Sequence, residues 1–320
     1  MRFFLRLIAL LLLFVVLALA ALRGVVALGE TQARDAALPA EGRLVDTALG
    51  RIYVEETGPS DGPVVLLVHG SIGWSRLWAE TQGALAAAGW RSIAFDLPPM
   101  GFSDRTPGDD YSRQHQADRI RALAAALGVR PVLVAHSVGA GPAAEAAMAD
   151  PAAFAGLVVI CGAIGLGEDG TGQSMPLPLR PRILRETMVA ATATNPFAMG
   201  FMLRMFVHRK EAATPGVIAV LRRPMALRGT TAALADWLPS LMVPPAGALS
   251  TTEAGWRDLA VPLALIWGAE DTATPPAQGE AIARITGAPM TVLPGVGHIP
   301  QIEDAAAFGA ALAAALEPMR

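Results

Sequence analysis

The stretch Val132-Leu-Val-Ala-His-Ser-Val-Gly139 is the most informative part of this sequence. Its first residues are uniformly apolar, which is typical of a strand buried on both faces of a sheet. Ala135 and Gly139 stand two positions either side of Ser137, and an alanine-rich helix pattern follows over Ala140–Ala149. A strand that turns sharply into a helix strains the central residue, and larger flanking side chains would collide with the turn. The stretch therefore predicts a strand–turn–helix unit that projects Ser137 from the carboxyl edge of a sheet.

Similar apolar runs recur on both sides of this stretch. Further strands are predicted at Arg51–Glu56, Val64–Val68, Ser92–Phe95, Leu157–Cys161, Leu263–Trp267 and Met290–Leu293. Helix patterns over Leu77–Ala88 and Gln114–Leu127 separate some of them, and Asp304–Leu316 is predicted as a closing helix. Strands that alternate with helices in this way predict an α/β fold, with a mostly parallel sheet flanked by helices.

The alternation is interrupted once, between Ile164 and Trp256. This segment has no pattern typical of a buried strand, but it contains helix patterns over Phe197–Phe206 and Thr230–Leu241. We therefore predict a core domain over residues 42–163 and 257–320, with residues 164–256 inserted as a helical cap.

Apolar residues concentrate at the amino terminus. An uncharged run over residues 7–22 lies between the basic residues Arg2 and Arg6 and the following Arg23. As a helix the run spans about 24 Å, and arginine side chains can extend toward the headgroups to complete a bilayer crossing. We predict a single-pass membrane anchor over residues 1–29 and a polar linker over 30–41.

The charges around this run bear on orientation. Arg2 and Arg6 favour a cytoplasmic amino terminus, which would place the domains that follow outside the cytoplasm. Two alternatives stay open. A signal peptide could be cleaved at the small residues of Ala18-Leu19-Ala20, so that the protein is exported, or the helix could be buried in the globular domain.

The composition excludes several classes of protein. The 320 residues are 53% hydrophobic and 17% charged, with a net charge of −3. A disordered protein needs the opposite balance. Lys210 is the only lysine and the arginines are scattered, so no nucleic-acid partner is expected. The single cysteine cannot form an internal disulfide, so the fold depends on its core.

Two later segments could activate Ser137, since a serine hydroxyl is a poor nucleophile without a base. His298 lies in Gly295-Val-Gly-His298-Ile-Pro300, a flexible loop after a strand, and is the candidate base. Glu270 and Asp271 follow the predicted strand Leu263–Trp267, and we choose Asp271 as the carboxylate that orients the base. The order Ser137, Asp271, His298 is the nucleophile–acid–base order of a Ser-His-Asp triad.

The remaining site residues concern the oxyanion and the substrate. The backbone N–H groups of Val138, at a helix start, and of Ser71, in a glycine-bearing loop after a strand, are the candidate oxyanion donors. The candidate substrate contacts are large apolar residues from the loop and the cap: Trp74, Met202, Met205 and Phe206. They would suit an apolar substrate, although packing of the cap onto the core explains the cap residues equally well.

With these segments identified, the chain resembles the α/β-hydrolase family, in particular serine esterases with a helical cap. The resemblance covers roughly residues 42–319 and rests on His69-Gly70-Ser71, Asp96–Ser103, Ala135–Gly139, Trp267–Asp271 and Gly297-His298. It implies an eight-stranded, mostly parallel sheet and no cofactor or metal. Haloalkane dehalogenases and epoxide hydrolases share the fold, but their nucleophile is an aspartate.

We therefore expect a serine hydrolase that cleaves carboxylic esters with a hydrophobic acyl or alcohol part through an acyl-enzyme. The same triad could instead catalyse amide or carbon–carbon bond hydrolysis or acyl transfer. A catalytically silent, membrane-tethered binding module is the third alternative. A dinucleotide site at Gly139-Ala-Gly141-Pro-Ala-Ala144 is not favoured, because no acidic residue ends the strand that follows. The sequence leaves the oligomeric state open.

Overall fold

A central sheet of eight strands organises the molecule, as seen in a computed structural model that describes residues 1–105 and 108–320. The spatial order is β1-β2-β4-β3-β5-β6-β7-β8. The strands are β1 (Gly42–Thr47), β2 (Gly50–Thr57), β3 (Val64–Val68), β4 (Arg91–Phe95), β5 (Val132–His136), β6 (Gly156–Ile160), β7 (Leu263–Gly268) and β8 (Met290–Leu293). Only the pairs β1–β2 and β2–β4 are antiparallel, so the predicted mostly parallel α/β fold is confirmed.

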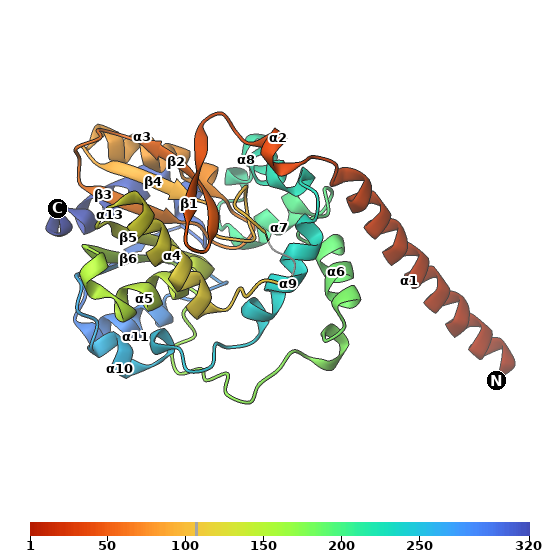
Figure 1. Ribbon diagram of the computed structural model, residues 1–320. Helices are drawn as coiled ribbons and strands as arrows, with labels where there is room; N and C mark the ends of the chain where they lie inside the picture. The colour runs from red at the N-terminus through yellow and green to blue at the C-terminus, as the bar shows by residue number, and fades with distance from the viewer. Residues whose placement is uncertain (106–107) are drawn as a thin grey trace.

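Helices cover both faces of this sheet. The chain moves one way across the sheet from β3 to β4 and the other way from β4 through β5 to β6. Because crossover connections are right-handed, α3 (Ala79–Ala87) lies on one face, and α4 (Arg113–Leu127) and α5 (Ala140–Ala149) lie on the other. Figure 1 shows α4 and α5 together, and α3 packs against the closing helix α13 (Ala305–Leu316). The central strands are buried on both faces, which explains their uniformly apolar sequences.

The cap, residues 164–256, contains no strand, and all of its residues are described. Its main helices are α6 (Arg182–Ala191), α7 (Met199–Phe206), α8 (Pro215–Arg222), α9 (Thr230–Met242) and α10 (Glu253–Arg257). The helix patterns at α7 and α9 predicted these elements, whereas α6 and α8 were not predicted. α6 packs against α9, and the cap lies between the carboxyl edge of the sheet and the amino-terminal helix (Figure 1).

The first helix, α1 (Arg2–Gly29), extends away from the rest of the molecule (Figure 1). The stretch Phe3–Gly29 contains an 18-residue window with a mean hydropathy of 2.9 and is long and apolar enough to cross a membrane, a property that a signal sequence shares. The residues after it do not form a free linker. Glu30 accepts hydrogen bonds from the N–H and hydroxyl of Thr231, Gln32 pairs with Leu227, and a short helix α2 (Arg34–Ala37) follows.

Candidate active site

Ser137 occupies the strained turn between β5 and α5. Its φ is +54°, a left-handed conformation that non-glycine residues rarely adopt. The neighbouring chain leaves no room for a larger residue at Gly139, since a Cβ there would lie 2.5 Å from the carbonyl oxygen of His69. The small residues around Ser137 are therefore required by the close approach of β3 and the turn. Strain of this kind persists only where the surrounding structure imposes it, and it is common at functional sites.

The structure brings Ser137, His298 and Asp271 together at the carboxyl edge of the sheet. Oγ of Ser137 lies 2.9 Å from Nε2 of His298, and Nδ1 of His298 lies 2.9 Å from Oδ2 of Asp271. All of these side chains are buried. With a neutral imidazole, Nδ1–H donates to the carboxylate, which leaves Nε2 to accept the hydrogen bond from the serine hydroxyl. This chain of hydrogen bonds is the arrangement that a Ser-His-Asp triad requires.

The Asp271 carboxylate is held on several sides. Its Oδ1 accepts the backbone N–H groups of Ala273 and Thr274, each at 2.9 Å. The hydroxyl of Thr274 lies 2.8 Å from Oδ2 and 2.9 Å from the carbonyl oxygen of Cys161. Burial alone would raise the pKa of Asp271, but the hydrogen bonds and charge of His298, together with Thr274, lower this pKa below its ordinary value. Asp271 is therefore ionised and can stabilise a protonated His298.

Two further histidines surround the triad as neutral groups. His136 donates from Nε2 to the carbonyl oxygen of His298 over 2.8 Å, which ties the loop carrying His298 to β5. His69 accepts the N–H of Leu97 at Nε2 over 2.9 Å and donates from Nδ1 to Gly70. Burial lowers the pKa of His136 to about 3 and that of His69 to about 4. Both histidines therefore hold loops in place, and neither competes with His298 for a proton near neutral pH.

Three side chains of the triad region have the chemistry of metal ligands. Potential ligand atoms of Cys161, Asp271 and His298 lie within 4.8 Å of one another. Burial strongly raises the pKa of the Cys161 thiol, so the sulfur stays protonated, and the other two side chains are hydrogen-bonded to each other. A cysteine binds a metal ion as its thiolate, and carboxylate and imidazole ligands need free lone pairs. This donor set does not suit a metal ion.

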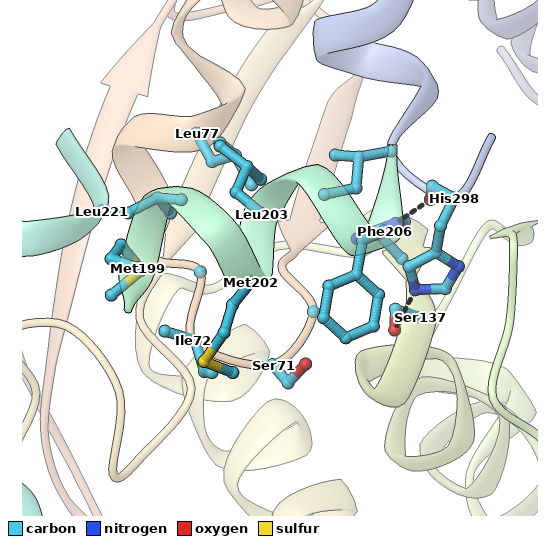
Figure 2. Close-up of a pocket in the computed structure, with 14 residues that line it drawn as sticks. Ser71, Ile72, Leu77, Ser137, Met199, Met202, Leu203, Phe206, Leu221 and His298 are labelled. Carbon is cyan, nitrogen blue, oxygen red and sulfur yellow. Dashed lines mark hydrogen bonds between the residues drawn. The ribbon is translucent and has the colours of Figure 1, made fainter. Parts of the chain in front are cut away.

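An apolar pocket with a cavity volume of about 50 Å³ adjoins Ser137 and His298. Figure 2 shows α7 running over it, with Met202 and Phe206 directed toward the space beside Ser137. The Phe206 ring lies 5.6 Å from the imidazole of His298, measured between ring centres. The lining also includes apolar residues that the sequence analysis did not single out: Ile72, Leu77, Met199, Leu203, Leu221 and Ile299. A pocket with so apolar a lining suits an apolar ligand.

Two predicted substrate contacts are corrected by the structure. Trp74 is fully buried, its indole N–H donates to the carbonyl of Val220 over 2.8 Å, and its ring packs against Phe102. It joins the loop to the cap and does not line the pocket. Met205 is 62% exposed and does not line the pocket, because it lies about 100° around α7 from its neighbour Phe206, which does.

The candidate oxyanion donors lie on either side of Ser137. Val138 follows the nucleophile at the start of the helical turn that leads into α5. Ser71 lines the pocket, and no carbonyl or side-chain oxygen of the described residues accepts its backbone N–H. Gly70 allows this loop to approach closely, since a Cβ there would lie 2.8 Å from the Cβ of Ser137. A free N–H beside a helix start is suited to binding an oxygen that gains negative charge.

Comparisons with known proteins agree with this geometry. Residues 65–311 match the model of the alpha/beta hydrolase family, and the chain therefore belongs to that family. An uncharacterized protein of Mycobacterium tuberculosis is 28% identical over 270 residues, which cover 77% of this chain and 73% of the relative. A 2-hydroxy-6-oxononadienedioate/2-hydroxy-6-oxononatrienedioate hydrolase of Burkholderia vietnamiensis is 27% identical over 267 residues, covering 81% and 88%.

Among solved structures, the chain is similar to a membrane phospholipase A that is a bacterial virulence factor. The TM-score is 0.69 at 23% identity, and the match covers 100% of this chain and 99% of the other. At this identity the similarity establishes the shared fold. The sequence-based prediction of an enzyme of the alpha/beta hydrolase family is confirmed.

Proposed function

We propose that the protein is a serine hydrolase that cleaves carboxylic esters with a hydrophobic acyl or alcohol part. The observation that carries this proposal is the hydrogen-bonded series from Ser137 through His298 to Asp271 at the end of an apolar pocket. Fold alone would not support it, because one fold hosts many reactions.

In the first half-reaction, His298 takes the proton of the Ser137 hydroxyl as the oxygen attacks the ester carbonyl. Asp271 stays ionised and stabilises the imidazolium that forms. The backbone N–H groups of Ser71 and Val138 would bind the negatively charged oxygen of the tetrahedral intermediate. His298 then returns the proton to the leaving alcohol, which leaves Ser137 acylated.

In the second half-reaction, water replaces the alcohol. His298 removes a proton from the water, which attacks the acyl-enzyme at the same carbonyl carbon. Collapse of the second tetrahedral intermediate releases the acid and returns the proton to Ser137. No step requires a cofactor, so the residues of this chain suffice.

The pocket supports the apolar character of the substrate. Its lining offers methionine, leucine and phenylalanine side chains, while its polar groups are concentrated near Ser137 and His298. Methionine side chains adapt to ligands of different shape. An alkyl or acyl limb placed among Met199, Met202 and Leu203 would leave the ester carbonyl beside Ser137.

One relative favours a second reaction for the same triad. The hydrolase of Burkholderia vietnamiensis carries a name that refers to a dienedioate substrate, so cleavage of a carbon–carbon bond is the alternative. Three kinds of substrate would distinguish ester, amide and carbon–carbon bond hydrolysis: p-nitrophenyl esters of increasing chain length, matched anilides and a vinylogous diketone acid. We expect the esters to be cleaved fastest. Failure of a fluorophosphonate to label Ser137 in folded protein would overturn the whole hydrolase proposal.

We also propose that α1 is retained as a membrane anchor. Arg23 donates to the carbonyl of Ile183 over 3.1 Å and forms an ion pair with Glu186 at 2.8 Å. Val26 is buried, and Glu30 is bonded to the cap. These contacts hold the end of α1 against the cap, as a helix that carries the domain at a bilayer surface requires. Cleavage after Ala20 would leave the same contacts in place, so the amino terminus of the mature protein distinguishes the two cases. Mass spectrometry of the protein from membranes would test this, with an intact amino terminus as the expected result.

A further inference from the structure

The cap presents an exposed apolar and basic segment beside α1, which we call the cap rim and define as residues 176–185. Leu177 is 73% exposed, Ile183 56% and Leu184 45%. Large apolar side chains that gather on a surface mark a site of contact with another phase or partner. The rim is also close to α1, because Arg23 bonds to the carbonyl of Ile183 and to the hydroxyl of Thr187.

The length of α1 places the rim relative to a bilayer. Its 28 residues span about 42 Å as a helix, whereas the hydrocarbon core is about 30 Å thick. About 20 residues fill that core, and the uncharged run ends at Leu22, so Arg23 falls at the boundary. Because Arg23 is bonded to α6, the start of α6 lies at the same depth as the lipid headgroups.

The charges of the rim suit an anionic lipid surface. Arg180 and Arg185 donate only to carbonyl and hydroxyl oxygens, and neither forms an ion pair with a carboxylate of the described residues. Arg182 is paired with Asp236 at 2.9 Å. Basic residues beside leucine and isoleucine at the start of a helix are typical of elements that lie in the membrane interface.

We infer that the cap rim is a second membrane-contact site, which inserts Leu177, Ile183 and Leu184 into the boundary between headgroups and acyl chains of the bilayer that α1 spans. The occupant of the rim is therefore lipid. This inference rests on the anchoring of α1 proposed above and is independent of the catalytic proposal. With both α1 and the cap rim in contact with the bilayer, the cap would be attached at two points, and these would fix its orientation on the membrane surface.

The single native cysteine allows a direct test. Cys161 is buried, so a bimane fluorophore attached to an introduced cysteine reports one position. The full chain would be placed in nanodiscs of phosphatidylcholine and phosphatidylglycerol, with or without brominated acyl chains. The variants are Leu177→Cys and Ile183→Cys in the rim and Leu13→Cys in α1. Ala87→Cys, exposed on α3 and distant from α1 in Figure 1, is the matched control.

We expect brominated lipid to quench the label at Leu13 strongly and at Leu177 and Ile183 at least two-fold, with no change at Ala87. Quenching at Leu13 without quenching in the rim would overturn the inference while leaving α1 as an anchor. No quenching at Leu13 would overturn both. Fluorescence does not depend on turnover, so these outcomes are separate from any failure of the ester-hydrolase proposal, which an assay with a soluble ester would show.

Discussion

The hydroxyl of Thr274 lies 2.8 Å from Oδ2 of Asp271, the oxygen that also faces His298. Oγ1 of Thr274 is 3.2 Å from Nδ1 of the imidazole as well, so it limits rotation of both side chains. Thr274 therefore acts as a positioning residue, since its hydroxyl holds the Asp271 carboxylate beside the imidazole without lining the pocket at Ser137.

This contact gives the first prediction. Thr274→Val should lower kcat about five- to ten-fold with little change in KM, because one hydrogen bond worth about 1 kcal/mol is lost behind the base. Thr274→Ser keeps the hydroxyl and should restore most of the rate. Steady-state kinetics on a soluble ester decides the question. Equal losses in both variants would point to a packing role instead.

Replacement of the nucleophile gives the second prediction. Ser137→Ala should reduce kcat by about a million-fold, as expected when a group that acts as a unit with others is removed. Its melting temperature should be equal to or higher than that of the parent, because alanine removes only one hydroxyl from a buried turn. Retained turnover at more than one per cent of the parent rate would refute the assignment of Ser137.

The pH dependence follows from the charge states around the base. The hydrogen bonds and charge of His298 lower the pKa of Asp271, and burial lowers the pKa of His136 to about 3 and that of His69 to about 4, so Asp271 is ionised and both histidines are neutral near neutral pH. None of these three groups should therefore change its charge near neutral pH, where the base must be neutral to accept the proton of Ser137. The acid limb of log(kcat/KM) against pH should show a single-proton slope. A two-proton slope would mean that a neighbouring histidine also titrates.

The pocket lining gives a fourth prediction with an internal control. Met202→Trp should fill space beside Ser137 and move the preferred p-nitrophenyl ester toward shorter acyl chains by two or more carbons. Met205→Trp adds the same bulk to the exposed outer side of α7 and should leave the preference unchanged. The readout is kcat/KM across the ester series. The same shift in both variants would show that the substrate does not lie beneath α7.

Shortened chains give a fifth prediction. A chain that begins at Arg23 should keep its melting temperature within a few degrees, because the described side chains of α1 before that residue pack little against the rest of the protein. A chain that begins at Gly42 also loses the bonds of Glu30 to Thr231 and of Arg34 to Asp104. We expect it to be less stable by about 1–3 kcal/mol, which denaturant unfolding would measure.

The sequence predicted the central strands well because they are buried on both faces, whereas the edge strand β1, which has exposed residues, was not predicted. Val64–Val68 and Met290–Leu293 have the predicted bounds, and Ala140–Ala149 is the predicted helix. α6 was missed because its sequence follows closely spaced prolines and its stability comes from packing against α9 and α1. Its apolar residues do recur at helical spacing, so a local signal was present but lay directly after the prolines that favour a loop.

The catalytic candidates could be predicted because each is tied to a local pattern: a tight turn, a strand end or a flexible loop. The substrate contacts could not. Two pairs of residues on α7 are equally apolar: Met202 with Phe206, and Phe201 with Met205. Only the tertiary fold decides which pair faces the pocket. Nothing in the local sequence identifies Thr274 as a positioning residue, apart from its place three residues after Asp271.

Between the triad and the outside, the wall formed by α7 is a single helix thick, with Phe206 inside and Phe201 exposed on its outer side. In an ester hydrolase built this way, a bound acyl chain and the methionine side chains above it shut out solvent together. Little water would then reach the acylated Ser137, so deacylation would be the slower half-reaction. An alcohol dissolved in the same lipid phase as the substrate would compete for that acyl group on favourable terms.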